Sequence, residues 1–186
     1  MPVIEPPYIF KYCEEDNWNK WKKDSCKSNC LVKSKGTVVK RRYCEHRGQR
    51  TANCTGPYYD VDLCDDSLLC IKKRKSIVEF STVKCGEFKI HANSAKMTFE
   101  LLIGSGNQMI HDVDIPWIAC TIFCRRKDMS IWYAPRKEML DYNVDPYFPD
   151  GTWCHNEGGQ NYYCRQHYCL PENYSFVKCK EYKNNC

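Results

Sequence analysis

Residues 18–30 read WNKWKKDSCKSNC, and this stretch decides the first part of the fold. Trp18 and Trp21 stand as Trp-x-x-Trp shortly before a pair of cysteines, Cys26 and Cys30. A segment this short buries too little apolar surface to build an ordinary hydrophobic core. The tryptophans are therefore expected to pack against other partners, and the cysteines to cross-link the chain.

Two strands are predicted downstream of this stretch. Residues 37–44 alternate long side chains in the manner of a strand, and they carry Lys40 and Arg42 two residues apart. Both cationic side chains therefore point to one face of that strand. Residues 58–64 (YYDVDLC) alternate in the same way, and we expect them to pair with the first strand.

Together these features resemble a thrombospondin type 1 repeat over residues 14–70. The resemblance implies a cation–π ladder of Trp18, Trp21, Lys40 and Arg42, in which each contact contributes about 0.5–2 kcal/mol. It also implies three disulfides, which are Cys26–Cys64, Cys30–Cys70 and Cys44–Cys54. In the chain-entropy model, closing the first of these loops stabilises the fold by about 4 kcal/mol.

The stretch departs from the family's pattern at several positions. Lys23 stands where the family has another tryptophan, and Asp60 and Asp62 replace its second basic strand. Those carboxylates are expected to face Lys40 and Arg42 across the sheet as a structural ion-pair ladder. Asn29 and Leu31 flank the second cysteine in place of the residues that O-fucosylation requires, so no fucose is expected. We favour a scaffold role over ligand contact for the ladder, because a domain without a core consumes those side chains.

The last part of the chain resembles the cysteine-rich domain of ADAMTS-type metalloproteases. The motifs are Trp117 before Cys120-x-x-x-Cys124-Arg125, the turn Asp150-Gly151-Thr152-x-Cys154, and Cys164-x-x-x-x-Cys169. In that family these motifs follow a thrombospondin repeat in this order. Gln166 or His167 replaces the family's usual glycine in the last motif. All eight cysteines of the region are expected to form disulfides, in pairs left open: Cys85, Cys120, Cys124, Cys154, Cys164, Cys169, Cys179 and Cys186.

The composition indicates an extracellular protein. Fifteen cysteines in 186 residues approach the density of a disulfide scaffold, and such thiols stay oxidised only outside the reducing cytosol. The longest uncharged stretch of hydrophobic weight, residues 115–124, is too short to span a bilayer, so no membrane span is expected. A net charge of +5 is too small for a dedicated nucleic-acid binder. Residues 1–12 contain no secretion signal. The odd cysteine count therefore favours a fragment of a longer secreted protein, with Cys13 unpaired or bonded to another module.

Four regions are expected along the chain, in a small disulfide-rich fold of mostly β-strands and loops. They are an extended tail (1–13), a thin three-stranded thrombospondin repeat (14–70), a basic connector (71–84) and a cysteine-rich domain with little helix (85–186). Further strands are predicted over residues 77–83, 96–103, 119–124 and 131–133, and one short helix over residues 135–142.

The connector carries the densest positive run of the chain. Lys72, Lys73, Arg74 and Lys75 follow one another, Lys84 closes the segment, and no residue nearby in sequence is expected to neutralise them. Such a run predicts a contact with a sulfated glycosaminoglycan, weakened steeply by salt, or else a solvated linker. Arg125, Arg126 and Lys127 would extend the strip if the fold brings the two segments together.

No catalytic motif is found in this chain. The His-Glu-x-x-His pattern that binds catalytic zinc is absent, because none of the histidines lies four residues from another: His46, His91, His111, His155 and His167. Each is expected at the solvated surface. No cofactor is expected here, and zinc would belong to a catalytic domain of the presumed parent protease.

The sequence thus predicts a non-catalytic, substrate- or matrix-binding part of a secreted ADAMTS-like metalloprotease. The alternative is a stand-alone secreted binding protein or inhibitor of the kind found in saliva or venom. Asn53 and Asn173 are predicted N-glycosylation sites, and Trp18 resembles a C-mannosylation acceptor.

Overall fold

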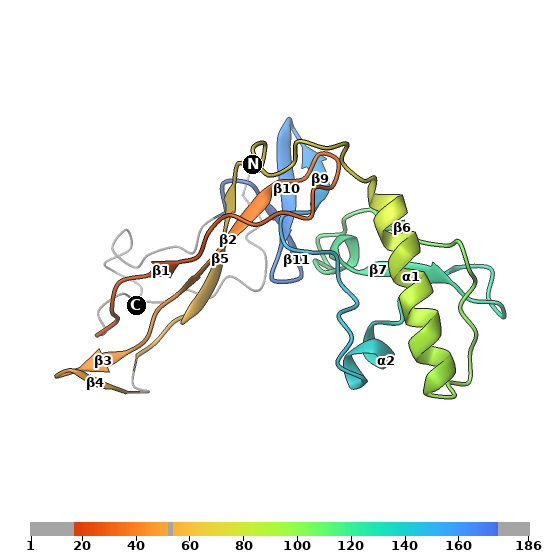
Figure 1. The fold of residues 1–186 in the computed structure, drawn as a ribbon, viewed down its shortest axis with the longest axis horizontal. Helices are drawn as coiled ribbons and strands as arrows, with labels where there is room; N and C mark the ends of the chain where they lie inside the picture. Colours follow the sequence, from red (N-terminus) through yellow and green to blue (C-terminus); the bar gives the residue numbers. More distant parts are fainter. Residues whose placement is uncertain (1–16, 52–53, 175–186) are drawn as a thin grey trace. The chain divides into compact units, whose positions relative to one another are not determined.

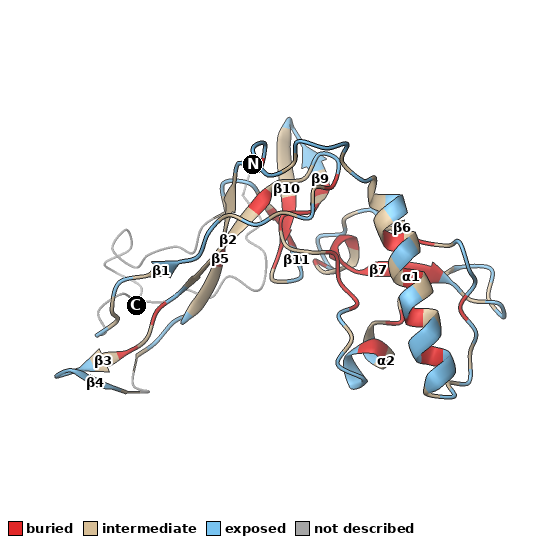
Figure 2. Ribbon diagram, viewed as in Figure 1, coloured by how far each residue is buried: buried red, intermediate tan, exposed pale blue. Residues whose placement is uncertain are grey.

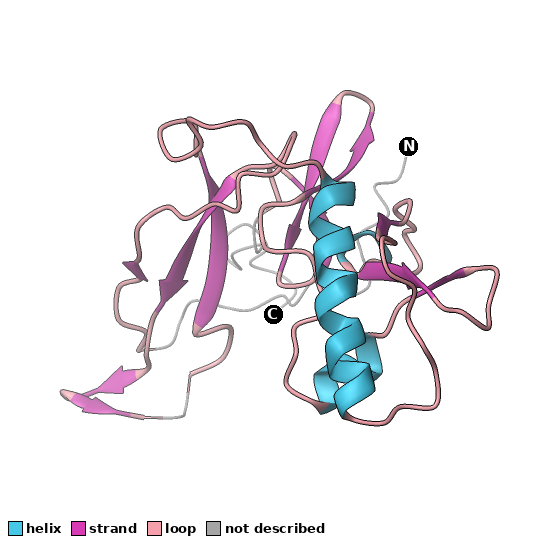
Figure 3. Ribbon diagram, turned by 45° about the vertical axis from the view of Figure 1, so that its right-hand side comes forward, coloured by secondary structure: helices cyan, strands magenta, loops and turns pink. Residues whose placement is uncertain are grey.

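The computed structural model describes residues 17–51 and 54–174, which form mostly strands and loops together with two α-helices (Figures 1 and 3). Six disulfides link its cysteines, so the predicted small, disulfide-rich, mostly β fold is confirmed. The described chain divides into two compact units. The first takes residues 17–25, 38–51, 54–62 and 173–174, and the second takes residues 26–37 and 63–172.

A three-stranded antiparallel sheet contains the predicted strand pair. Its strands are β1 (Lys22–Lys23), β2 (Gly36–Arg41) and β5 (Tyr59–Cys64), in the order β1-β2-β5. The residues buried in the first unit are few. Among its described residues they are Arg42, Cys44 and Val61. The shortage of core predicted from the sequence is therefore real, and the unit needs other interactions to hold its shape.

A short hairpin extends the first unit beyond this sheet. Its strands are β3 (Glu45–His46) and β4 (Gln49–Arg50). The two residues between them, Arg47 and Gly48, both have positive φ angles, of 50° and 79°. That is the backbone of a type I′ turn, whose twist matches that of the strands it joins.

The main helix of the second unit is α1 (Ile77–Ser94), which occupies a stretch predicted as strand. The prediction over residues 77–83 is wrong because a capping box starts a helix there. Ser76 accepts the Glu79 N–H at 3.0 Å, and Glu79 accepts the Ser76 N–H at 2.7 Å. The buried side chains, Ser81, Cys85, Phe88 and Ala92, recur at helical spacing and lie along one side of the helix (Figure 2).

The strand predicted over residues 96–103 is also wrong. Lys96 follows the helix with φ 51°, the left-handed conformation common just beyond a helix C-terminus. Its neighbour Met97 donates a backbone hydrogen bond to the Ala92 carbonyl at 3.0 Å, which closes the helix end. Only Leu101 of the predicted strand makes a bridge, to Arg126.

A second sheet of three short strands packs against α1. It consists of β6 (Asn107–Gln108), β7 (Ile122–Arg125) and β8 (Trp132–Tyr133), in the order β6-β7-β8. A 3-10 turn, η1 (Ile118–Cys120), precedes β7, so the strand predicted over 119–124 begins later than expected. The predicted short helix is present as α2 (Arg136–Asp141).

The end of the described chain forms an antiparallel meander. Its strands are β9 (Trp153–Glu157), β10 (Gln160–Arg165) and β11 (Tyr168–Pro171), in the order β11-β10-β9. Gln166 and His167 join the last two strands with φ angles of 49° and 75°. These are the positions where the family of resemblance has its glycine, and here two ordinary side chains adopt the left-handed conformation instead.

The core of the second unit is built largely around disulfides. Cys85–Cys124, Cys120–Cys164 and Cys154–Cys169 all lie within it, with Phe88, Leu101, Ile122, Met139 and Phe148 packed beside them. These bonds give the pairing that the sequence left open for six of the eight cysteines. Cys13, Cys179 and Cys186, whose pairing was also at issue, lie outside the described residues.

Gly151 explains the Asp-Gly-Thr turn before β9. Its φ is 89°, and an added Cβ would lie 2.2 Å from the Lys35 carbonyl oxygen. The backbones approach this closely because the Lys35 N–H donates to the Gly151 carbonyl at 2.9 Å. Only glycine permits both the conformation and the contact.

Within the described residues, neither helix combines the length and the apolar character that crossing a bilayer requires.

Candidate functional site

The predicted ladder of the first unit is present and is centred on one arginine. The Arg42 guanidinium lies 4.3 Å from the ring centroids of both Trp18 and Trp21. Arg42 is only 6% exposed, and its Nε donates to the Pro57 carbonyl at 2.9 Å. The Trp18 indole N–H donates to the Thr55 carbonyl at 2.8 Å. These contacts hold strands and loops together where a hydrophobic core is lacking.

Lys40 completes the ladder through carboxylates as well as through Trp21. Its ammonium lies 2.9 Å from Asp60, 2.7 Å from Asp62 and 5.3 Å from the Trp21 centroid. Burial alone would lower the pKa of Lys40, but the bonds to Asp62 and Asp60 outweigh it and raise that pKa. The pKa of Asp62 is lowered, because bonds to Lys40 and Lys23 outweigh its own burial. Asp60 and Asp62 both pair with Lys40, whereas Arg42 lies between the tryptophans.

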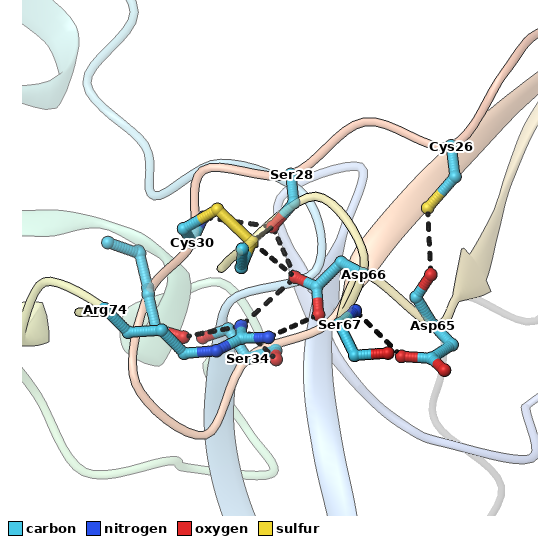
Figure 4. The surroundings of a disulfide bond; sticks show 10 residues. Cys26, Ser28, Cys30, Ser34, Asp65, Asp66, Ser67 and Arg74 are labelled. Carbon is cyan, nitrogen blue, oxygen red and sulfur yellow. Dashed lines mark hydrogen bonds and ion pairs between the residues drawn. A yellow bond between two sulfur atoms is a disulfide. The ribbon is translucent and has the colours of Figure 1, made fainter. Parts of the chain in front are cut away.

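The three disulfides of the first resemblance are the pairs it implied: Cys26–Cys64, Cys30–Cys70 and Cys44–Cys54. The first two lie in the second compact unit. Of these two, Cys30–Cys70 stands beside the residues that hold Arg74 (Figure 4), with the Cys70 Sγ 3.4 Å from the Ser28 hydroxyl oxygen.

Arg74 of the basic run is committed to the fold. Its guanidinium forms a two-pronged ion pair with Asp66, with Nη2–Oδ1 at 2.6 Å and Nη1–Oδ2 at 3.1 Å (Figure 4). The same Nη1 lies 3.3 Å from the carbonyl oxygens of Leu31 and Ser34. The expectation that no residue nearby in sequence neutralises the basic run is therefore wrong for Arg74, because the fold brings the Asp66 carboxylate into contact with its guanidinium.

Asp66 is the centre of this arrangement. Its carboxylate is 5% exposed and accepts hydrogen bonds from Arg74 and from the Ser28 hydroxyl. Burial would raise the pKa of Asp66, but the bonds from Arg74 and Ser28 hold that pKa below its usual value. The Ser28 oxygen in turn accepts the Cys30 N–H at 2.9 Å. Asp66 thus ties Arg74 to the loop that carries Cys30.

The remaining cations of the run face solvent. Lys72, Lys73 and Lys75 are exposed, and within residues 17–51 and 54–174 no ion pair holds any of them. The Lys75 backbone is nevertheless fixed, since its N–H donates to the Cys30 carbonyl and its carbonyl accepts the Val32 N–H. Lys84, placed on α1, pairs with Glu87 at 2.7 Å. The candidate anion-binding group is therefore three exposed lysines, which lie between the Cys30–Cys70 disulfide and the backbone bonds of Lys75 or at those bonds.

The second basic stretch is largely occupied. Arg126 pairs with Asp128 at 2.5 Å, and Lys127 lies 3.3 Å from Glu100. Arg125 donates to the Ser130 carbonyl at 2.9 Å and stacks on Trp132 at 4.6 Å. Carboxylates neutralise two of its three positive charges. This stretch therefore adds little to the basic strip that the sequence predicted.

Two histidines lie in a packed cluster, which differs from the expected solvated positions. The rings of His111 and His155 are 4.8 Å apart, and Tyr162 contacts both. Burial and the neighbouring His155 lower the pKa of His111, and its Nδ1 is buried without a hydrogen-bond partner. His46, His91 and His167 are exposed as expected, and the His167 ring stacks on that of Tyr147 at 3.7 Å.

Three cysteine sulfurs also lie close together, those of Cys120, Cys154 and Cys169. All three belong to disulfides, so they offer no thiolate for a metal ion. Of the predicted modification sites, Asn173 is exposed, Trp18 is half-buried in the ladder, and Asn53 lies outside the described residues.

The residue that sequence reasoning missed is Asp66. A signal was present, because Asp65 and Asp66 directly follow Cys64 and lie close in sequence to the basic run. The pairing depends on the turn that brings residues 66 and 74 together, which no periodicity reveals.

Comparison with protein-family models, with curated proteins and with solved structures finds no match to this chain. The two resemblances therefore stay predictions.

Proposed function

We propose that this chain is a non-catalytic binding part of a secreted ADAMTS-like metalloprotease, which holds a protein substrate or matrix component near a catalytic module elsewhere. Linking a binding site to a catalytic site in this way raises the local concentration of substrate. The disulfide-rich fold supports an extracellular setting, because such bonds persist under oxidising conditions.

The observation that carries the binding role is the division within the basic run. Arg74 is held on Asp66, whereas Lys72, Lys73 and Lys75 are exposed to solvent. Three exposed cations close together in sequence attract a polyanion, and their flexible side chains can adjust to its charged groups. A sulfated glycosaminoglycan is the matrix polyanion we assign to them.

The test is elution from heparin resin. Changing Lys72, Lys73 and Lys75 to serine, with Arg74 retained, should lower the salt concentration that elutes the protein. A matched control changes three other exposed lysines to serine: Lys20, Lys27 and Lys137. The control removes the same charge, so a specific site predicts a much smaller shift. Equal shifts in the two variants would show that heparin responds to net charge and not to a specific site. An unchanged elution salt in the first variant would show that these three lysines do not bind heparin.

A further inference from the structure

The turn before the basic run exposes large apolar side chains to solvent. Leu68 is 92% exposed, Ile71 is 84% exposed and Leu69 is 52% exposed. Single exposed aliphatic residues are ordinary, but three within four positions form a patch. Nothing in the heparin-binding proposal uses them.

This exposure belongs to a fixed turn. The N–H groups of Leu69 and Cys70 donate to the Asp66 carbonyl at 3.0 and 2.9 Å, and the Ser67 N–H donates to the Asp65 carboxylate at 2.9 Å. The Cys30–Cys70 disulfide and the Asp66–Arg74 ion pair anchor both sides (Figure 4). The apolar tip is therefore held away from the core by bonds on either flank.

Cations follow the apolar tip directly. Lys72 and Lys73 come next after Ile71, and both are exposed. Asp65 in the turn is exposed and keeps its charge, because the Ser67 N–H lowers the pKa of its carboxyl, so the segment sets two lysines against this one anion. Aliphatic side chains beside lysines suit an anionic bilayer surface, because the aliphatic groups enter the acyl boundary while the ammonium groups stay at the level of the phosphates.

We propose that residues 68–73 dock the protein reversibly on an anionic phospholipid surface, with Leu68 and Ile71 entering the interface and Lys72 and Lys73 contacting the headgroups. A sulfated polysaccharide offers no apolar partner and would leave Leu68 in water. A lipid surface uses both halves of the segment.

The experiment measures co-sedimentation with vesicles of phosphatidylcholine alone or with about 30% phosphatidylserine, a composition chosen to supply the surface potential. The protein should bind the anionic vesicles in a salt-sensitive manner and bind neutral vesicles much more weakly. Changing Leu68 and Ile71 to serine should weaken binding about tenfold or more, since two aliphatic side chains are lost from the interface. Heparin elution of that variant should stay unchanged.

A matched control changes Ile110 and Val113 to serine, two side chains that are 86% and 64% exposed elsewhere in the same unit. It should bind vesicles as the unmodified protein does. Near-ultraviolet circular dichroism checks that each variant is folded. A Leu68→Trp variant gives an independent readout, because its emission should shift to the blue on anionic vesicles.

Three results would overturn the proposal. They are no binding of the unmodified protein to anionic vesicles, undiminished binding after the Leu68 and Ile71 changes, and an equal loss in the Ile110 and Val113 control. If the Leu68 and Ile71 changes instead lower heparin elution and leave vesicle binding intact, the tip belongs to the polysaccharide site. Capture of a protein partner that depends on Leu68, without any lipid binding, would reassign the tip to a protein interface.

Discussion

Asp66→Asn should be among the most damaging single changes of a polar residue in this chain. The carboxylate is 5% exposed and bonds the Arg74 guanidinium twice, at 2.6 and 3.1 Å, as well as the Ser28 hydroxyl. Removing one member of a fully buried pair costs about 3–5 kcal/mol. Arg74 is 27% exposed and can be partly hydrated, and asparagine keeps one acceptor oxygen. The expected loss in unfolding free energy is therefore about 2–3 kcal/mol.

The assay is urea unfolding with the disulfides intact, followed by near-ultraviolet circular dichroism. Hydrogen exchange by mass spectrometry adds a local readout, because the Leu69 and Cys70 N–H groups bond the Asp66 carbonyl. Asp114→Asn is the control, since it removes an exposed carboxylate from the same unit. A double-mutant cycle with Arg74→Gln should give a coupling energy of more than about 1 kcal/mol.

The same pair predicts an acid dependence. The pKa of Asp66 in the folded protein lies below its usual value near 3.8, despite burial, because Arg74 and Ser28 bond the ionised form. Its stabilisation is thus complete above pH 3.8 and is lost as the pH falls through the folded pKa. The unfolding free energy of the Asp66→Asn variant should therefore vary less with pH across that acid range than that of the unmodified protein. A loss below about 0.5 kcal/mol, or identical acid profiles, would refute the reasoning.

Three further predictions concern the backbone and are tested by urea unfolding. Gly151→Ala should lower the unfolding free energy by about 2 kcal/mol or more, because the φ of 89° and the Lys35 carbonyl oxygen, 2.2 Å from the new Cβ, both oppose a side chain. An unchanged urea midpoint would contradict this. Ser76→Ala removes the N-cap of α1 and should lower the unfolding free energy by about 1 kcal/mol, whereas Ser76→Asp keeps a capping oxygen and should retain the stability. Equal stability of the unmodified protein and both variants would show that the cap contributes nothing. Gln166→Gly should gain up to about 1 kcal/mol by relieving a left-handed residue, and a loss would show that the glutamine side chain outweighs that strain.

The sequence allowed the first sheet to be predicted because its signals are local. Residues 58–64 alternate, and Lys40 and Arg42 share one face with no helical alternative. The ladder itself was implied by the resemblance to a thrombospondin repeat, and Arg42 does lie against both tryptophans. Here the local pattern and the tertiary contact specify the same structure.

Helix α1 escaped prediction because two local signals compete. Ile77, Val78 and Val83 are β-branched and favour a strand. The buried face of the helix carries Ser81 and Ala92 beside its larger residues, so the helical periodicity of apolar residues is weak. The capping box at Ser76 was the one decisive local sign, and disulfide pairing of Cys85 with Cys124 then supplies packing that no periodicity reports.

The basic run shows why a charge count is a poor guide to a binding site. Arginine presents a planar fork that matches a carboxylate in two bonds, whereas lysine presents one flexible ammonium. Arg74 makes two bonds to Asp66 and two more to main-chain oxygens, and a lysine at that position would replace few of them. The neighbouring lysines meet no such acceptor among the described residues and remain at the surface. Within this run, the arginine serves the fold and the lysines stay exposed to solvent. Any test of binding by this run should therefore leave Arg74 unchanged.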